Sequence, residues 1–280
     1  MVNTAAEQRS HESRAPSGRP ALRVRGINYD TGFTGDGHAS RSIFDPGLVR
    51  QEMGVIADDL HCTAVRVSGG DLDRLAVAGR AALDAGLELW FAPFPTELTP
   101  SELTRCLTDA AERAAVLDRA FPGRVVLVMG CEISLFNAGF LPGETFTERA
   151  TNLMTWPWSD EQMAAFRGLS AALDGFFTGA LAAVRKKFHG RVSYASGTWE
   201  TLDWTPFDIV GIDGYRDAQN AATYRQQLRT YLATGKPVAV TEFGCCTYRG
   251  AADRGGMGWA IVDRNQTPAR LDGPYERSED

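Results

Sequence analysis

Two kinds of segment alternate along the chain, and the first kind is a short, almost continuously apolar run. Seven such runs are rich in β-branched and aromatic residues. Near-continuous apolarity is typical of strands that are covered on both faces. The pattern therefore predicts seven buried strands: RVRGINY (23–29), TAVRVS (63–68), LELWFAPF (87–94), RVVLVMGCE (124–132), RVSYAS (191–196), DIVGIDGY (208–215) and PVAVTEF (237–243).

The second kind of segment has apolar residues at helical spacing and recognisable ends. In the first of them, Asp45 is the expected N-cap and Pro46 the first helical residue, and Leu48, Ile56 and Leu60 fall at roughly helical spacing. Five helices are predicted in this way: 46–60, 70–85, 100–120, 160–188 and 218–233.

The ends of several of these helices carry capping signals. The openings TPSE and SDEQ place Thr99 three residues before Glu102 and Ser159 three residues before Gln162, which is the spacing of a capping box. Two glycines stand where C-terminal caps are expected, Gly86 and Gly235.

Strands that alternate with helices in this order predict a parallel sheet with right-handed crossovers. The sheet is either open and doubly wound or closed into a barrel. The first strand leads into GINYDTGFTGDG, which has glycines but neither the dinucleotide-binding spacing nor a helix directly after it. The sequence therefore favours the α/β fold class of (β/α)8 TIM barrels.

The eighth strand of such a barrel is the weak point of this prediction. GWAIVD (258–263) is apolar enough, but the segment before it is too short and too rich in glycine for a helix. We expect residues 244–272 to form a long loop over the barrel mouth, and YERSED (275–280) to be the first turn of the helix that should follow strand seven. The barrel would then lack its last helix and strand and would have two exposed edges.

The domain organisation follows from composition. Residues 1–22 are rich in Ser, Pro, Gly, Arg and Glu, which predicts a disordered tail. Since no linker-like segment interrupts the rest, residues 23–280 are predicted to form one TIM-barrel domain.

The carboxyl ends of the predicted strands carry the candidate chemistry, because barrel active sites lie there. Glu132 ends the fourth strand and Glu242 the seventh, so their carboxylates should face each other across the mouth. A pair of carboxylates cleaves a glycoside with retention when one protonates the leaving oxygen and the other attacks the anomeric carbon. Arg66 and the hydroxyl of Tyr215 are placed to support the nucleophile.

The motifs VLVMGCE, VAVTEFG, AVRV and GIDGY resemble those of the retaining glycoside hydrolase superfamily of (β/α)8 barrels, over residues 23–263. This resemblance implies that Glu132 is the acid/base and Glu242 the nucleophile, and that Arg66 and Tyr215 are the strand-two arginine and the strand-six tyrosine. Two features differ from the family: Cys131 stands where an Asn usually holds the sugar 2-hydroxyl, and the strand-three histidine is absent. The motifs also resemble uncharacterised actinobacterial sequences labelled "abortive infection protein".

Further residues are candidates for substrate binding. Asn28 ends the first strand near Tyr29 and Asp30, and Cys131 flanks the acid. Aromatic side chains that follow strands four and five could stack on sugars or simply pack in the core: Trp156, Trp158, Trp199 and Trp204. Asp213 is compatible with a ligand-facing carboxylate, but the Asp-Gly pair favours an ordinary turn.

Charge and cysteine content narrow the class of protein. The formal charge of −6 comes with dispersed Lys and Arg, so we expect neither a nucleic-acid nor a membrane partner but a small molecule or saccharide. No apolar stretch approaches a membrane span or a secretory signal, and the five cysteines lack metal-site spacing with histidines. The sequence predicts a cytoplasmic protein of carbohydrate metabolism that needs no metal or organic cofactor.

Two other functions stay open at this point. The same barrel could host a biosynthetic lyase, cyclase or transferase, a hypothesis that Cys131 in place of the Asn motivates. An incomplete eighth strand would instead suit a non-catalytic carbohydrate-binding or phage-defence (abortive infection) component. The oligomeric state, the sugar and the anomeric preference do not follow from the sequence.

Overall fold

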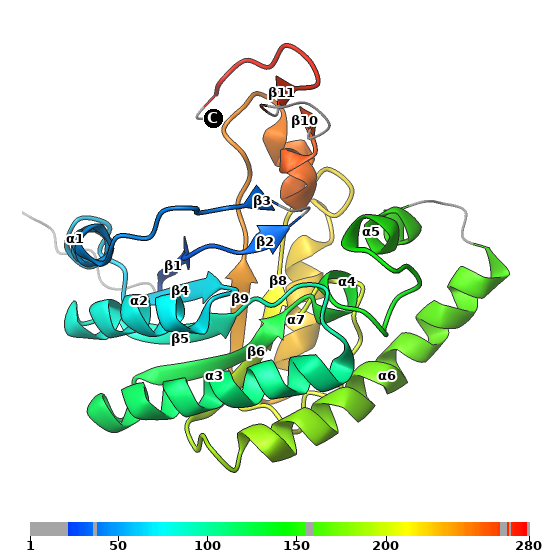
Figure 1. Ribbon diagram of the computed structural model, residues 1–280. Helices are drawn as coiled ribbons and strands as arrows, with labels where there is room; N and C mark the ends of the chain where they lie inside the picture. The colour runs from blue at the N-terminus through cyan, green and yellow to red at the C-terminus, as the bar shows by residue number, and fades with distance from the viewer. Residues whose placement is uncertain (1–21, 36–37, 155–158, 264–267, 269, 279–280) are drawn as a thin grey trace, which may run out of the picture.

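Seven parallel strands follow one another around a curved sheet (Figure 1). The computed structural model describes residues 22–35, 38–154, 159–263, 268 and 270–278. The order is β1-β4-β5-β6-β7, and β8 pairs with β9. A parallel bridge from Ser196 to Ile212 joins the two sets. All seven predicted strands are present: β1 (Gly26–Asp30), β4 (Ala64–Gly69), β5 (Glu88–Pro93), β6 (Val125–Cys131), β7 (Arg191–Ala195), β8 (Val210–Asp213) and β9 (Val238–Glu242).

The strands separate two apolar clusters, because successive side chains point to opposite faces. Along β6, Val126 and Val128 belong to a small cluster inside the curved sheet, whereas Val125 and Leu127 pack in the large cluster beneath the helices. Every residue of β6 is buried. This explains why the runs read as continuously apolar rather than as alternating.

Helices cover the outer face of the sheet, and their sequence signals are present in the structure. Asp45 caps the first helix through the amides of Gly47 and Leu48, and both predicted capping boxes form. No helix in the described ranges is long and apolar enough to cross a membrane. The helices are α1 (Pro46–Asp58), α2 (Leu72–Asp84), α3 (Pro100–Ala120), α4 (Ile133–Phe136), α5 (Phe146–Met154), α6 (Asp160–Val184) and α7 (Tyr224–Leu232).

The buried face of α1 differs from the predicted one. Ile56 is buried, but Leu48 and Leu60 are largely exposed, and the core is filled instead by Val49 and Met53. Val49, Met53 and Ile56 are four and three residues apart, which is helical spacing, so the helix turns a neighbouring stripe toward the sheet.

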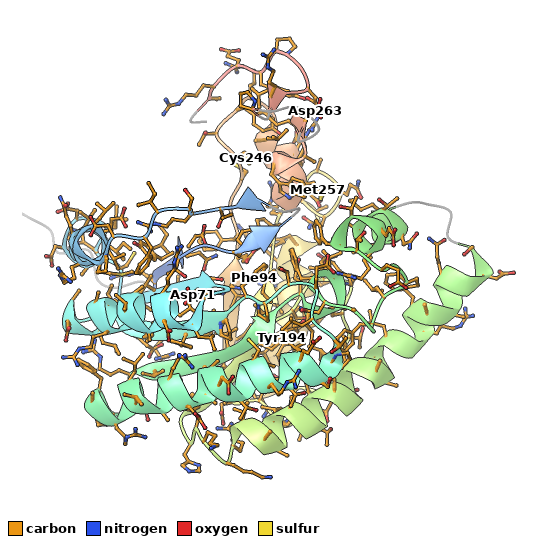
Figure 2. All side chains as sticks on the ribbon, in the orientation of Figure 1. Asp71, Phe94, Tyr194, Cys246, Met257 and Asp263 are labelled. Atoms are coloured by element: carbon orange, nitrogen blue, oxygen red, sulfur yellow. The ribbon has the colours of Figure 1, made fainter. Side chains whose placement is uncertain are left out.

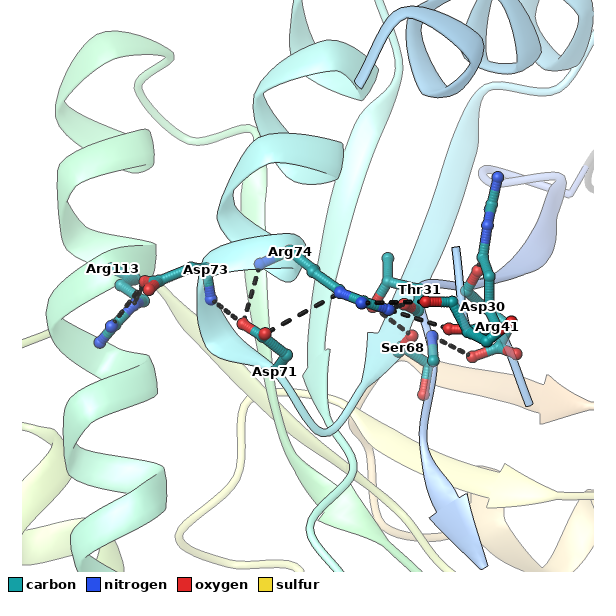
Figure 3. A network of polar contacts seen from close by, with 10 residues as sticks. Asp30, Thr31, Arg41, Ser68, Asp71, Asp73, Arg74 and Arg113 are labelled. Carbon is teal, nitrogen blue, oxygen red and sulfur yellow. Dashed lines mark hydrogen bonds and ion pairs between the residues drawn. The ribbon is translucent and has the colours of Figure 1, made fainter. Parts of the chain in front are cut away.

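The loops at the carboxyl ends of β1 and β4 are fastened to α2 by a polar network (Figure 3). Arg74 donates to the carbonyl oxygens of Thr31 (3.3 Å) and Arg41 (2.9 Å), and Asp71 caps the helix from which Arg74 projects. Arg113 of α3 is paired with Asp73 at 2.7 Å. These contacts hold in place the loops that surround the strand ends.

The barrel is not closed by a backbone ladder between β1 and β9 within the described ranges. At this seam, the side-chain amide of Asn28 donates to the carbonyl oxygen of Thr241 at 3.1 Å. Both edge strands are less buried than the central ones, and Ile27 is 43% exposed. Within the described ranges, side-chain contacts from Asn28 and Arg66 to β9, rather than a backbone ladder, therefore span the gap that an eighth strand would fill.

The C-terminal segment forms a separate lobe beyond the strand ends (Figure 1). It contains short 3₁₀ helices at Ala251–Asp253 and Gly255–Trp259 and an antiparallel pair, β10 (Val262–Asp263) with β11 (Arg270–Leu271). A second antiparallel pair, β2 (Thr34–Gly35) with β3 (His38–Ala39), lies in the first loop. The prediction that 275–280 begins a helix is wrong for residues 275–278, which are not helical and bridge back to Tyr248 through Arg277.

Gly211 of β8 lies at a close approach between β7 and β8. A Cβ at this position would lie 2.2 Å from the carbonyl oxygen of Tyr194 and 2.8 Å from Oγ of Ser193. Because the first of these is a backbone atom, Gly211→Ala should lower the free energy of unfolding by about 1–3 kcal/mol, measured by urea denaturation.

Gly54→Ala in α1 is the matched control, since a Cβ there meets nothing within 4 Å. That substitution should stabilise the protein by about 0.5–1 kcal/mol through helix propensity. Equal effects of the two substitutions would contradict the close approach of β7 and β8.

Candidate active site

A cavity of about 640 Å³ opens at the carboxyl ends of the strands. Seven of the residues predicted to act there line it, and the structure brings them together from six strands and the loops that follow them. The side chains of Trp156 and Trp158, also predicted, lie outside the described residues. The predicted residues that line the cavity are Asn28, Arg66, Cys131, Glu132, Trp199, Tyr215 and Glu242.

Glu242 at the end of β9 is held by two donors. Arg66 donates to its Oε1 atom at 2.8 Å, and the hydroxyl of Tyr215 donates to its Oε2 atom at 2.9 Å. Arg66 is only 6% exposed, and its Nε atom has no hydrogen-bond partner in the described part of the chain. The carboxylate is thereby fixed in orientation at the cavity wall.

Glu132 follows β6 in an unusual backbone conformation. Its φ of 41° lies in the left-handed region, which costs a non-glycine residue free energy, and Gly130 two positions earlier has φ 96°. The register between β6 and β7 also shifts between Val128 and Cys131. This irregular strand end turns the side chain of Glu132 into the cavity.

The pKa of Glu132 is raised well above its ordinary value. Burial is the largest cause, and the negative charges of Asp213 and Glu242 add to it, while Arg66 opposes it. Unlike Glu242, Glu132 has no side-chain hydrogen bond to another described residue. The two glutamates therefore occupy electrostatically different positions in one cavity.

Asp213 is a third acid in the site, and the expectation that it forms an ordinary turn is wrong. It is the last residue of β8, is 2% exposed and lines the cavity. Burial and the charge of Glu242 raise its pKa to about 7, against the opposing effects of Arg66 and hydrogen bonds from Thr241 and Cys131. Its surroundings come from other strands, so the local Asp-Gly signal could not reveal them.

Cys131 lies between two of the acids. Its Sγ atom donates to Oδ2 of Asp213 at 3.4 Å and lies 3.6 Å from Oε1 of Glu242. Burial and these two negative charges raise the pKa of the thiol well above its usual range. Cys131 is thus held as a neutral thiol that faces carboxylates. Cys245, which also neighbours a glutamate in sequence, is exposed and does not line the cavity.

The same three side chains could hold a metal ion by distance alone. Potential ligand atoms of Cys131, Asp213 and Glu242 lie within 4.8 Å of one another. The guanidinium of Arg66 at 2.8 Å from Glu242 already supplies a positive charge there, and it would repel a cation. We assign no metal role to this cluster.

A buried glutamate that the sequence does not reveal positions the segment after Glu132. Oε1 of Glu200 accepts from the amide (3.2 Å) and hydroxyl (2.6 Å) of Ser134, and its Oε2 accepts from Tyr194 at 2.8 Å. The hydroxyl of Tyr194 in turn accepts from the amide of Ile133 at 2.8 Å. Burial raises the pKa of Glu200, and these hydrogen bonds oppose that rise.

The tryptophans of the β7–β8 connection divide between site and core. Trp199 lines the cavity, and its indole donates to Oγ of Ser134 at 3.1 Å. Trp204 is 9% exposed and packs against Phe207 in the core. Of these two tryptophans, Trp199 is therefore the one available to a ligand.

Comparisons with known proteins give a fold and no family. No family model and no curated protein matches the chain. A GH113 β-mannanase from Alicyclobacillus acidocaldarius in complex with ManMIm has a TM-score of 0.53 at 17% identity, over 82% of this chain and 74% of that one. A second GH113 β-1,4-mannanase has a TM-score of 0.53 at 14% identity, over 81% of this chain and 73% of that one. A GH5 family lichenase from Caldicellulosiruptor sp. F32 has a TM-score of 0.50 at 12% identity, over 84% of this chain and 79% of that one.

These similarities confirm the predicted fold class. The chain has the fold of glycoside-hydrolase (β/α)8 barrels, although its barrel is not closed within the described ranges. The strands that carry Arg66, Asp213 and Glu242, and the strand that Glu132 directly follows, are part of this fold.

The pKa of Asp213 predicts a pH-dependent effect on stability. In the unfolded chain this carboxyl titrates near 3.8, and in the folded protein near 7. Between these values the folded state binds more protons, so this group makes the protein less stable as pH rises from about 4 to about 7. Asp213→Asn should therefore increase the free energy of unfolding, relative to the parent, more at pH 8 than at pH 5 in urea denaturation.

Asp203→Asn is the control. Hydrogen bonds from Thr205 lower the pKa of Asp203 below its ordinary value of 3.8, so this carboxyl is ionised in both the folded and the unfolded state from pH 5 to pH 8, and its substitution should change stability by the same amount at both pH values. If Asp213→Asn shifted stability equally at both pH values, the carboxyl would not be perturbed as described.

Proposed function

We propose that this protein is a glycoside hydrolase in which Glu132 is the acid/base and Glu242 the nucleophile of a retaining mechanism. The asymmetry between the two glutamates supports this proposal above all else. Glu242 is oriented by Arg66 and Tyr215, whereas Glu132 lacks such donors and has a raised pKa. Retaining cleavage needs one carboxylate to attack and one carboxylic acid to donate a proton.

In the first step, Oε of Glu242 attacks the anomeric carbon while the proton of Glu132 passes to the leaving oxygen. The C–O bond to the leaving group breaks, and a covalent glycosyl-enzyme forms on Glu242. In the second step, Glu132, now ionised, takes a proton from water, which attacks the anomeric carbon and releases Glu242. The raised pKa of Glu132 favours the protonated acid, so kcat should fall as pH rises through that pKa.

The remaining predicted residues are assigned to binding. Asn28 and Arg66 hold the backbone at Thr241, next to the nucleophile, through its carbonyl oxygen (3.1 and 3.5 Å). Tyr215 orients Glu242, and Trp199 presents an aromatic ring at the cavity. Such a ring can stack on the apolar face of a sugar. Cys131 occupies the position beside the acid where it contacts Asp213 and Glu242.

The buried thiol is the observation that favours a second candidate, a lyase, cyclase or transferase on the same barrel. A neutral thiol is a weak hydrogen-bond partner and a poor holder of a sugar hydroxyl. Such an enzyme would use Glu132 and Glu242 as acid and base without a covalent glycosyl intermediate. Mass spectrometry after incubation with 2-deoxy-2-fluoro glycosides separates the two, since only the retaining hydrolase gains a covalent adduct at Glu242.

Substitution of each glutamate tests the assigned roles. Glu242→Gln should abolish hydrolysis of every glycoside, because Gln cannot form the glycosyl ester. Glu132→Gln should lower kcat by about 10²–10⁴-fold on substrates with poor leaving groups, and by less on nitrophenyl glycosides, whose leaving group needs no proton. Steady-state kinetics on matched nitrophenyl and methyl glycosides measure the difference.

Glu52→Gln is a control, because Glu52 pairs with Arg41 and neither residue lines the cavity. It should leave kcat unchanged. Full hydrolysis by both cavity variants would rule out the proposal. Binding of oligosaccharides with no turnover by the parent, measured by calorimetry, would instead support a non-catalytic carbohydrate-binding or phage-defence component.

A further inference from the structure

One wall of the cavity is apolar and comes from the segment that follows the proposed acid. Phe136 closes α4, and α5 turns Phe146, Ala150 and Leu153 toward the cavity at helical spacing, with Met154 beside them. Phe94 after β5 continues this wall, and Figure 2 labels it together with Met257 of the C-terminal segment, which also lines the cavity. We call Phe33, Phe94, Phe136, Phe146, Ala150, Leu153 and Met154 the aromatic wall.

The rings of the aromatic wall form a continuous row. Phe33 and Phe94 lie 5.0 Å apart, and Phe94 and Phe136 lie 4.7 Å apart, both edge to face. Phe136 and Phe146 are stacked at 4.9 Å with an angle of 10° between their planes. None of these side chains offers a hydrogen-bond donor or acceptor.

The wall is held rigidly above the strand ends. Arg149 of α5 is fully buried and donates to the carbonyl oxygen of Leu135 at 2.7 Å. Its guanidinium also pairs with Glu97 at 2.5 Å, and Glu97 accepts from the amide of Phe146 at 2.6 Å. The apolar surface is therefore preformed rather than created by a ligand.

The polar residues of the cavity come from other elements. Asn28, Arg66, Asp213, Tyr215 and Glu242 come from β1, β4, β8 and β9 or directly follow them. The cavity is thus divided into a polar part around the nucleophile and an apolar part that adjoins Glu132. A sugar ring needs hydrogen-bonding partners for its hydroxyl groups, so it belongs in the polar part.

We infer that the substrate is a glycoside with an apolar alkyl or aryl aglycone, and not a polysaccharide. This inference rests on the proposed function, in which Glu132 protonates the leaving oxygen and so lies on the aglycone side. A second sugar there would turn hydroxyl groups toward the aromatic wall, where they would lose water without gaining partners. An alkyl chain or an aromatic ring would bury apolar surface against it.

The test compares aglycones on one sugar. Methyl, butyl and octyl glycosides of glucose, mannose and galactose are assayed below their critical micelle concentrations, beside gluco- and manno-oligosaccharides. For the sugar that is turned over, kcat/KM should rise by about fourfold for each methylene group from methyl to butyl. Leu153→Ser with Met154→Ser should lower the octyl-to-methyl ratio of kcat/KM by about tenfold or more.

Val116→Ser is the matched control, because this 57% exposed side chain of α3 lies outside the cavity. It should not alter the ratio. Efficient hydrolysis of oligosaccharides, together with no effect of the length of the alkyl aglycone on kcat/KM, would overturn the inference and leave the proposed hydrolase standing. If no glycoside is turned over, but calorimetry shows that octyl glycosides bind more tightly than methyl glycosides only when the wall is intact, the hydrolase fails and the apolar subsite stands.

Discussion

The buried guanidinium of Arg66 is the constraint around which the site is organised. A charge at 6% exposure is tolerated only when opposite charge lies beside it, and here Glu242 contacts it directly while Asp213 lies close enough to affect it. Arg66 projects from β4 and Glu242 from β9, so the ion pair spans the β1–β9 seam, where no backbone ladder joins the edge strands within the described ranges. The requirement to neutralise one charge therefore also holds the two sides of the opening together.

One positive charge faces three carboxyl groups, and this imbalance separates their roles. Arg66 contacts Glu242, so the remaining acids must reduce their charge by keeping protons. The pKa of Asp213 is raised to about 7 and that of Glu132 is raised well above its ordinary value, in both cases with burial as the first cause. Burial and the position of a single arginine thus make the carboxyl groups of one cavity electrostatically different.

The sequence predicts much of this arrangement because strand ends converge in a parallel barrel. Apolar runs locate the seven strands, and topology alone brings Glu132 and Glu242 to one mouth. Local capping signals likewise predict that helices begin after Thr99 and Ser159. Features that depend on packing between distant segments were not predictable. No feature of the neighbouring sequence indicates that Glu200 is buried and hydrogen-bonded to Tyr194. The stripe of α1 that faces the core begins at Val49, one residue after the predicted Leu48.

The conformation of Glu132 shows how the neighbouring strand determines the direction of the proposed acid. A left-handed φ of 41° is unfavourable by itself and persists only where surrounding contacts determine it. Those contacts come from β7 and its loop, because Tyr194 and Glu200 engage the amides of Ile133 and Ser134 directly after the acid. The helix that begins there ends at Phe136, in the aromatic wall. Glu132 and the start of the aromatic wall at Phe136 are therefore fixed by one buried hydrogen-bond network.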